Sequence, residues 1–547
     1  MRGMPVIQGV KKVLAMIESV EAPFIRWCAA FLGILFVRFL LETFSSPTPS
    51  FPATPEVASL IHYVLFFIGA FLSLALVIRI FVPDIARISK FLIFGFPIVW
   101  LAPILDLVYS NGAGATMTYA FASNTADLWY AFFHFGAIGT LGGITAGLRT
   151  EIIAIFIGAG LYVAIKTGGW GKAVLAALFS YCALFLWGIA PNLLSLAATG
   201  VAFPDPGIFS SLISSFASSH LLQNFVRPSY GLSPTLAVET IFNLGMSSAL
   251  YLVDFALAIV WVAAYRGALL RGLARCLRLG RIAYYYSLLA MGAFVAMRAG
   301  TPAPFANWVD ALSFACLALA YLSAFGFATG VNDIADVHID RLNGVSRPLL
   351  TGAVTEGDLA QSNWFFLAWA LIGGFLAGYW AFFTIIAGTA AYYIYSAPPL
   401  RFKRVPIIAP FLVAIAGLST TMAGFFFVDE RKLVVDFPLQ LLLLILVCLT
   451  LAQNFKDLKD IEGDRAHSIW TIPVLFGERL GKPVVGALLA AAFLAVPVIL
   501  HDTALFAPSL AAAVLGYLFV VARPYREWPI FLLYFAYAGT VGWLLVR

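Results

Sequence analysis

Apolar runs of about 18 to 25 residues recur along most of the chain, and they set the strongest limit on its fold. At the rise of an α-helix, such a run matches a hydrocarbon core roughly 30 Å thick. Helices satisfy their own backbone groups in lipid, and no alternation of polar and apolar residues suggests a barrel. With 62% hydrophobic and only 11% charged residues, the chain does not have the composition of a soluble globule. The sequence therefore predicts an all-α polytopic membrane protein.

The apolar runs fall into two sets on either side of a basic segment. We predict about six or seven spans in residues 1–265, which would form a transmembrane helical domain of unknown role. Two of these candidates, near 128–147 and 151–167, are weak because their sequence is rich in glycine. Five arginines lie in residues 266–281, and we interpret this segment as a basic linker on the cytoplasmic surface. Residues 282–547 supply nine further predicted spans.

Two acidic segments end apolar runs in the second half and share one spacing. Each carries three aspartates at positions i, i+3 and i+7, which fall on one face of an α-helix. Three like charges on one face are costly unless a cation joins them. Two such faces opposite each other would form a cage for hard divalent cations, and those cations could hold a diphosphate. The candidate metal-binding and catalytic residues are Asp333, Asp336 and Asp340 in the first segment and Asp457, Asp460 and Asp464 in the second.

Lysine and arginine are distributed unequally between the loops of the second half. One side carries the linker arginines and further basic residues within 341–347, 401–404, 456–482 and 523–526. By the positive-inside rule this side faces the cytoplasm. Both acidic segments emerge on it, as a shared site requires.

Polar and basic residues near the acidic segments would complete a diphosphate site. Mg²⁺ prefers a few carboxylates together with phosphate oxygens, and basic side chains pair with the oxygens that the metal leaves available. When a prenyl–diphosphate bond breaks, these groups stabilise the charge that grows on the leaving group. A simpler interpretation of the basic residues is that they only signal topology. The candidate diphosphate-binding residues are Asn332, Arg347, Arg401, Lys403, Lys456 and Lys459.

Three ordered motifs carry a family resemblance. The first is Asn332-Asp333-x-x-Asp336-x-x-x-Asp340 followed by Arg347-Pro348. The second is Asp457-x-x-Asp460-x-x-x-Asp464 followed by Thr471-Ile472-Pro473, and between them lies the loop from Tyr395 to Lys403. These motifs resemble those of the UbiA superfamily of intramembrane prenyltransferases, over roughly residues 270–547. The loop is similar to that of the chlorophyll-synthase-like branch, although the family's Tyr-x-x-x-Lys spacing is not reproduced after Tyr395, so Arg401 and Lys403 are both candidates for its basic role.

The resemblance implies a fold and an activity. It implies a nine-helix bundle, Mg²⁺, and transfer of a polyprenyl group from its diphosphate to a lipophilic acceptor, which would be an aromatic ring or a lipid headgroup. Residues 460–464 look like the branches that prenylate homogentisate, chlorophyllide or geranylgeranylglyceryl phosphate. The acceptor and the length of the prenyl chain stay open.

Two other function classes compete with this interpretation. One is a lipid transporter, or a membrane protein that binds a lipid diphosphate without cleaving it, and the other is a UbiA-type terpene cyclase, which needs no acceptor. Nothing in the sequence indicates nucleic-acid binding. We recognise no family in the first half, and its Arg38 and Glu42 have the i, i+4 spacing of a structural ion pair.

Overall fold

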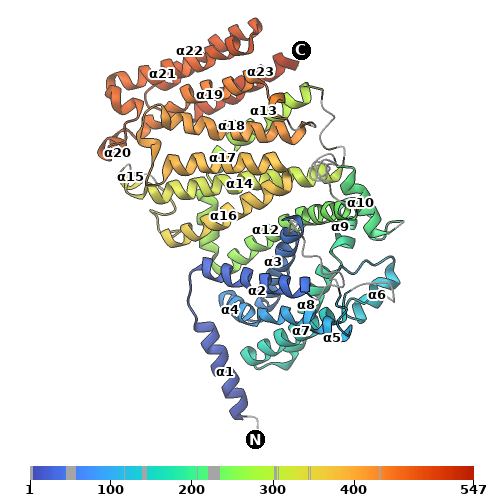
Figure 1. The fold of residues 1–547 in the computed structure, drawn as a ribbon. Helices are drawn as coiled ribbons and strands as arrows, with labels where there is room; N and C mark the ends of the chain where they lie inside the picture. The colour runs from blue at the N-terminus through green and yellow to red at the C-terminus, as the bar shows by residue number, and fades with distance from the viewer. Residues whose placement is uncertain are drawn as a thin grey trace. The chain divides into compact units, whose positions relative to one another are not determined.

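The regular elements of the computed structural model are all helices in the part of the chain that it describes, and no strand is found there (Figure 1). Thirteen helical segments in that part are long and apolar enough to cross a membrane. The predictions of an all-α fold and of an integral membrane protein are therefore confirmed. The described residues are 4–44, 57–115, 118–137, 144–205, 207–219, 234–300, 305, 307–342, 344, 346–429, 431 and 433–546.

The chain divides into two compact units. Unit 1 comprises Met1–Leu270 and Phe305–Cys316, and unit 2 comprises Arg271–Pro304 and Leu317–Arg547. Whether the two halves have separate roles, as the predicted domains imply, stays a prediction.

Unit 1 contains six of the thirteen candidate spans, within the predicted range. The candidate near 128–147 is not among them, because its helix ends at Phe133 and positive φ angles at Phe135 and Gly136 turn the backbone away. The helices are α1 (Met4–Ser19), α2 (Phe24–Phe44), α3 (Val57–Arg79), α4 (Ile85–Gly95), η1 (Phe96–Trp100), α5 (Leu101–Tyr109), α6 (Thr125–Phe133), α7 (Ala146–Thr167), α8 (Trp170–Gly188), α9 (Ala190–Thr199), α10 (Ile208–Ala217) and α12 (Pro234–Cys276), the last of which continues into unit 2.

The predicted basic linker is almost entirely helical. α12 continues through it as far as Cys276, with one non-helical residue at Arg266 (φ −156°, ψ 94°). The next helix begins at Leu279, directly after Arg278, which has the left-handed conformation (φ 46°, ψ 58°). The turn at Arg278 therefore sets the direction in which the Arg278 side chain extends from the backbone.

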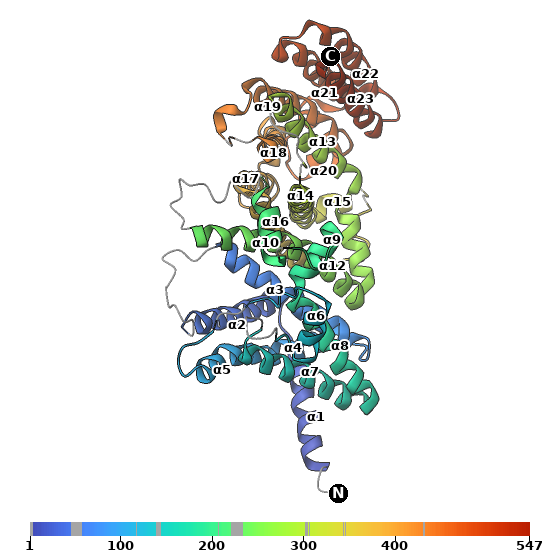
Figure 2. The ribbon, with the colours of Figure 1, turned by 90° about the vertical axis from the view of Figure 1, so that its right-hand side faces the viewer.

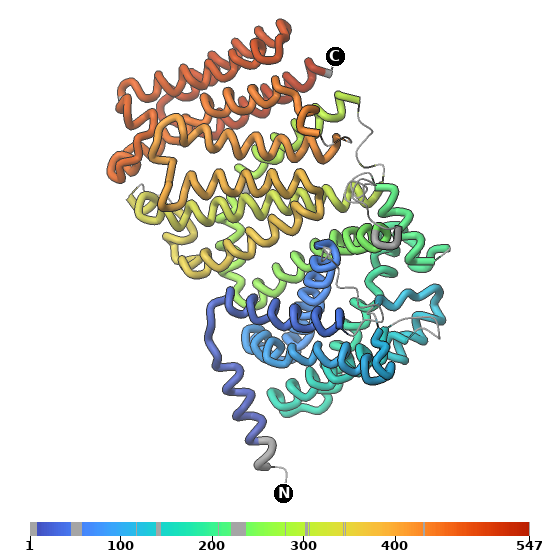
Figure 3. Tube along the Cα trace, in the orientation of Figure 1, coloured from blue at the N-terminus to red at the C-terminus, as the bar shows by residue number. Residues whose placement is uncertain are grey.

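Unit 2 contains nine helices of fourteen or more residues in its described part, which confirms the predicted nine-helix bundle. Figures 1 and 3 show α16, α14, α17 and α18 side by side as a layer, and Figure 2 shows α14 and α17 nearly along their axes. The nine are α13 (Leu279–Arg298), α14 (Trp308–Ala335, which starts in unit 1), α16 (Glu356–Ala377), α17 (Tyr379–Ser396), α18 (Ile408–Val428), α19 (Leu439–Ala452), α21 (Ile472–Leu500), α22 (Phe506–Val521) and α23 (Trp528–Val546).

Short helices in unit 2 lie mainly at the ends of the long ones. α15 follows α14, and α20 follows α19 through a 3-10 helix. α15 and α20 contact each other, and so the two acidic segments that contain them meet. The short helices are α15 (Val337–Leu342), α20 (Ile461–Ala466), η3 (Phe402–Arg404), η4 (Val434–Asp436), η5 (Gln453–Lys459) and η6 (Thr503–Leu505).

The crossing of α13 and α18 in unit 2 depends on two glycines. A Cβ on Gly292 of α13 would lie 2.8 Å from the backbone nitrogen of Phe425 in α18. A Cβ on Gly424 of α18 would lie 2.8 Å from the carbonyl carbon of Leu289 in α13. Small residues let membrane helices approach until their backbones touch. This crossing positions the wall that α13 and α18 contribute to the pocket described below.

We expect Gly292→Leu to destabilise unit 2 by about 1–3 kcal/mol, because the new side chain has no space between α13 and α18. Thermal unfolding of the purified protein in detergent measures this loss. The matched control is Gly539→Leu in α23, where a Cβ would meet no atom within 4 Å. Equal unfolding temperatures for the two variants would contradict the packing argument.

Candidate active site

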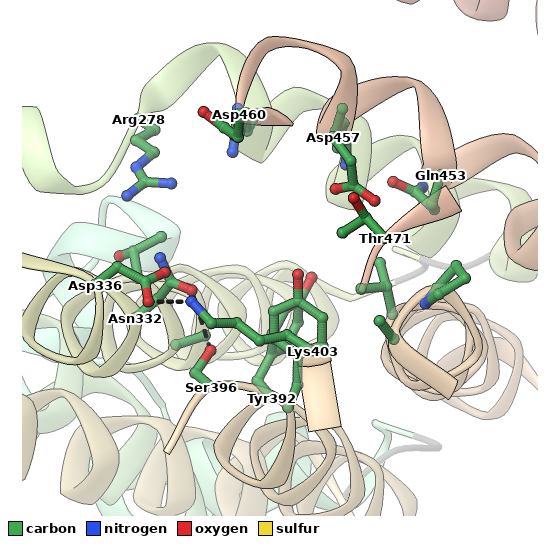
Figure 4. A pocket seen from close by; sticks show the side chains of 18 of the residues that line it. Arg278, Asn332, Asp336, Tyr392, Ser396, Lys403, Gln453, Asp457, Asp460 and Thr471 are labelled. Atoms are coloured by element: carbon green, nitrogen blue, oxygen red, sulfur yellow. Dashed lines mark hydrogen bonds and ion pairs between the residues drawn. The ribbon is translucent and has the colours of Figure 1, made fainter. Parts of the chain in front are cut away.

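A pocket of about 190 Å³ lies in unit 2 where α14 and α19 end. Asp336 and Asn332 lie on one side of it, and Asp457 and Asp460 lie across from them (Figure 4). The predicted residues that line the pocket are Asn332, Asp336, Asp340, Arg347, Lys403, Lys456, Asp457, Lys459, Asp460 and Asp464. Two predicted residues, Asp333 and Arg401, do not line it.

The first acidic segment is not one continuous helix. α14 ends at Ala335 and α15 begins at Val337, with Asp336 between them. The helical hydrogen bonds nevertheless continue, because the Asp336 N–H donates to the Asn332 carbonyl and the Asp340 N–H donates to the Asp336 carbonyl, each at 2.9 Å. This preserved spacing explains how Asp336 and Asp340 line one wall.

Asp333 binds Arg278 and lies apart from the pocket lining. Its side chain is 1% exposed, and one carboxylate oxygen accepts a hydrogen bond from the Arg278 guanidinium. The other oxygen has no hydrogen-bond partner among the described residues. Burial lowers the pKa of Arg278, and the negative charge of Asp333 opposes that shift. Arg278 itself lines the pocket, so Asp333 orients a cation toward the site.

Both basic candidates of the connecting loop bind Asp336. Arg401 Nη2 donates to the Asp336 carboxylate at 2.9 Å and to the Ala335 carbonyl at 3.0 Å. Lys403 Nζ donates to the same carboxylate oxygen, and its side chain is 8% exposed. Burial lowers the pKa of Lys403, while Asp336 opposes the shift. Of the two, Lys403 is the one that lines the pocket.

Two further contacts order the first wall. Arg347 Nε donates to the Asp340 carboxylate at 3.2 Å. Ser396, the last residue of α17, donates through its hydroxyl to the Asn332 side-chain oxygen at 3.2 Å. Each acidic or amide group of this wall is therefore held by a side chain from another segment.

The prediction of a single α-helix for the second acidic segment is wrong. Gln453–Lys459 forms the 3-10 helix η5, Asp460 is non-helical (φ −105°, ψ 9°), and α20 begins at Ile461. In a 3-10 helix, side chains three residues apart eclipse each other. Asp457 and Asp460 have that separation, and both still line the pocket, as does Asp464.

The two lysines of the second segment are held by groups on other elements. Lys456 Nζ lies 5.5 Å from the ring centroid of Tyr284 and 5.8 Å from that of Phe531. Lys459 Nζ lies 3.0 Å from a carboxylate oxygen of Glu527. Ring faces attract an ammonium group, so Tyr284 and Phe531 hold the Lys456 side chain, which lines the pocket.

Burial and crowding raise the pKa of carboxyl groups on the second wall. The pKa of Asp464 is raised to about 7, first by burial and then by the negative charge of Asp460. Burial also raises the pKa of Asp460. A divalent cation beside these carboxylates would oppose both shifts, because it favours the charged form.

The donor set suits Mg²⁺ only if a phosphate ligand completes the site. Within the part of the chain that the structure describes, no three His, Cys, Asp or Glu side chains converge closely enough to hold a metal by themselves. Mg²⁺ commonly uses one or two carboxylates, several waters and the phosphates of its substrate. The pocket offers carboxylate oxygens on two facing walls together with basic side chains. This arrangement fits a metal shared with a phosphate better than the closed protein cage that the aspartate spacing predicts.

Several residues of the pocket were not predicted to have a site role. Arg278 and Arg281 were interpreted as linker charges, although an arginine close to an acidic segment could have indicated a partner. The aromatic run at the start of α13 supplies Tyr284 and Tyr285 to the lining. Gln453 donates to the Tyr284 hydroxyl at 2.9 Å, a contact that sequence spacing does not reveal.

We expect Arg278→Met to destabilise the protein by about 3–5 kcal/mol, because a buried carboxylate then loses its ion-pair partner. Adding Asp333→Asn should restore part of this loss, since the amide carries no charge. Thermal unfolding of the single and double variants measures both effects. The control is Arg281→Met, which breaks a longer and more exposed pair with Glu527 (3.6 Å). If the double variant has an unfolding temperature no higher than that of Arg278→Met, the structural role of Asp333 is refuted.

Comparisons with known proteins match the second half of the chain. A family model described as the UbiA prenyltransferase family matches residues 287–529. Digeranylgeranylglyceryl phosphate synthase of Natronomonas pharaonis is 32% identical over 231 residues, which are 42% of this chain and 76% of that protein. Chlorophyll synthase of Oryza sativa subsp. japonica is 31% identical over 188 residues, or 32% of this chain and 49% of that protein.

Further relatives follow the same pattern. Homogentisate phytyltransferase of Synechocystis sp. is 30% identical over 178 residues, which are 29% of this chain and 54% of that protein. The chain thus spans about half the length of several curated relatives that it matches. A solved structure of a UbiA homolog from Archaeoglobus fulgidus bound to DMAPP and Mg²⁺ is 18% identical, with a TM-score of 0.38, and the match covers 50% of this chain and 99% of that one. The names of these three relatives, a digeranylgeranylglyceryl phosphate synthase, a chlorophyll synthase and a homogentisate phytyltransferase, correspond to the three branches that residues 460–464 resemble.

Proposed function

Because the chain belongs to the UbiA prenyltransferase family, we propose that it is an intramembrane prenyltransferase. It would move a polyprenyl group from its diphosphate to a lipophilic acceptor and release diphosphate, with Mg²⁺ as cofactor. The observation that carries this proposal is a pocket in unit 2 where two acidic helix ends face each other and basic side chains also line the wall. That arrangement suits a diphosphate and its metal ions.

The carboxylates of the two walls would hold Mg²⁺. When bound, Mg²⁺ supplies positive charge that stabilises the diphosphate as it leaves. We assign the metal-binding role to Asp336, Asp340, Asp457, Asp460 and Asp464. Asp333 is assigned a positioning role instead, because its contact is with Arg278.

The basic side chains of the pocket would bind the diphosphate oxygens that face away from the metal. Arg347 and Lys403 approach from the first wall, and Lys456 and Lys459 approach from the second. Arg401 would act through Asp336, which it holds in place. Charge-assisted hydrogen bonds to phosphate strengthen as charge grows on the leaving group, so these residues would lower the barrier to breaking the carbon–oxygen bond.

Aromatic side chains would surround the allylic end of the prenyl chain. The pocket lining includes Tyr284, Tyr285, Tyr392, Tyr395 and Phe531. Their ring faces attract positive charge, and their bulk excludes water that would quench an allylic cation. The acceptor, which carries an aromatic ring or a lipid headgroup, would approach from the bilayer and attack the allylic carbon as the bond to diphosphate breaks. It would then lose a proton to a carboxylate or to water.

The pocket would face the cytoplasm. Basic residues cluster in the segments that surround it, including 401–404 and 456–482, and such clusters stay on the cytoplasmic side of a membrane. Residues 282–547 would form the catalytic domain.

We expect Asp457→Asn and Asp464→Asn each to lower magnesium-dependent release of diphosphate from geranyl diphosphate by about 100-fold or more, because each removes charge beside the leaving group. A coupled assay for diphosphate, with purified protein and a membrane lipid extract as the source of acceptor, measures the loss. Thermal unfolding checks that both variants stay folded.

The matched control is Asp502→Asn at the start of η6. Asp502 caps that helix by accepting from the Ala504 N–H and does not line the pocket, so its activity should not change. Full activity in Asp457→Asn or Asp464→Asn would exclude the proposed metal site.

A further inference from the structure

A second cavity lies within unit 1, far larger than the pocket of unit 2. Its volume is about 590 Å³, and its walls come mainly from α3, α4, η1, α7, α8 and α12. Sites for small ligands usually enclose about 300–1,000 Å³. The cavity lies within this range and has room for a small organic molecule.

Aromatic rings dominate the wall of this cavity. Eleven of its thirty-three lining residues are Phe, Tyr or Trp, whereas these types make up 15% of the chain. The rings also contact one another: the centroids of Phe66 and Trp187 are 5.9 Å apart, and those of Tyr119 and Phe242 are 6.2 Å apart. Rings in such networks prefer edge-to-face and offset contacts with a further ring, so the wall favours a flat, unsaturated ligand.

The charge of the wall is acidic, in contrast to the pocket of unit 2. Among the described residues that line the cavity there is no Lys or Arg, whereas Glu42, Glu151 and Glu239 contribute to it. Arg38 is buried beside the cavity and is bound by Glu151 at 2.6 Å and by the Val99 carbonyl. Its charge is therefore directed to protein groups. A phosphate or carboxylate would find no cation among the described residues of the wall, and burying an unpaired anion is costly.

Neutral hydrogen-bonding groups interrupt the apolar wall. His62 Nε2 and the Tyr119 hydroxyl form a hydrogen bond of 2.6 Å, and the Asn243 amide donates to the Ser59 hydroxyl at 2.8 Å. A few polar groups in an otherwise apolar cavity orient a ligand through its own polar atom. These groups suit a hydroxyl or carbonyl oxygen.

We propose that the cavity of unit 1 binds an uncharged lipophile that carries a ring system and one hydroxyl or carbonyl group. This site is distinct from the diphosphate pocket, and the proposal does not depend on the activity proposed for unit 2. Three features of the cavity favour this ligand class: its volume, its aromatic lining, and the absence of Lys and Arg among its described lining residues.

Photolabelling of the purified full chain in lipid nanodiscs tests this proposal with two probes matched in size. 4-Benzoylbenzyl alcohol is neutral and 4-benzoylbenzoate is an anion. After irradiation, mass spectrometry locates the labelled peptides. We expect saturable labelling of peptides from α3 and α8 that line the cavity, at least about tenfold stronger with the alcohol than with the carboxylate.

Filling the cavity should abolish this labelling. Gly158 lines the cavity, and a Cβ built on it would meet no atom within 4 Å, so Gly158→Leu occupies free space without a backbone clash. Ala154→Phe fills the same cavity from a neighbouring position on α7. We expect each variant to reduce labelling by the alcohol about tenfold or more.

The matched control is Gly33→Leu in α2, where a Cβ would also meet no atom within 4 Å and which does not line the cavity. Its labelling should equal that of the unaltered protein. Three results would overturn the proposal: equal labelling by both probes, labelling that survives both filling variants, or labels confined to peptides outside the cavity. Because the readout is labelling of unit 1, it is independent of diphosphate release by unit 2.

Discussion

Pairing of buried carboxylates with cations from other segments is the interaction on which the pocket of unit 2 depends. A buried charge without a partner is costly, because burial removes its hydration. Only an opposite charge close by compensates for that loss. Asp333 is paired with Arg278, Asp340 with Arg347, and Asp336 with Arg401 and Lys403. These cations come from the turn before α13, the segment after α15 and the loop that contains η3. The ion pairs thereby fasten several helix ends around one cavity, and they leave oxygens and ammonium groups directed into it.

The pocket of unit 2 and the cavity of unit 1 differ in the charge that they accept. The pocket of unit 2 combines aspartates with arginines and lysines, which suits a diphosphate that arrives with a metal ion. The described wall of the cavity in unit 1 has glutamates and aromatic rings without a cation, which suits an uncharged lipophile. A prenyl transfer within a membrane would bring together a prenyl diphosphate and an uncharged lipophile. Each cavity nevertheless takes its selectivity from its own lining.

The lengths of the apolar runs and the spacing of the aspartates were enough to predict much of the helical architecture and of the site. Spans follow from apolar runs because lipid demands a helix of fixed length. The repeated spacing of aspartates identified both walls of the pocket. Local backbone geometry was less predictable: the 3-10 helix at Gln453–Lys459 and the break at Asp336 depend on tertiary packing. Partners distant in sequence were missed for the same reason. Arg38 was expected to pair with Glu42, yet Glu151 lies closer, at 2.6 Å against 3.9 Å.

Under the proposed function, the pocket of unit 2 transfers a prenyl group rather than only binding or hydrolysing its diphosphate. The most direct measurement uses a prenyl diphosphate labelled in both its carbon chain and its phosphates, with purified protein, Mg²⁺ and a membrane lipid extract. We expect each released diphosphate to be matched by one labelled chain joined to a lipophilic acceptor, and removal of Mg²⁺ to stop both. Binding without release of diphosphate, or release with the chain recovered as a free alcohol or cyclic hydrocarbon, would contradict it.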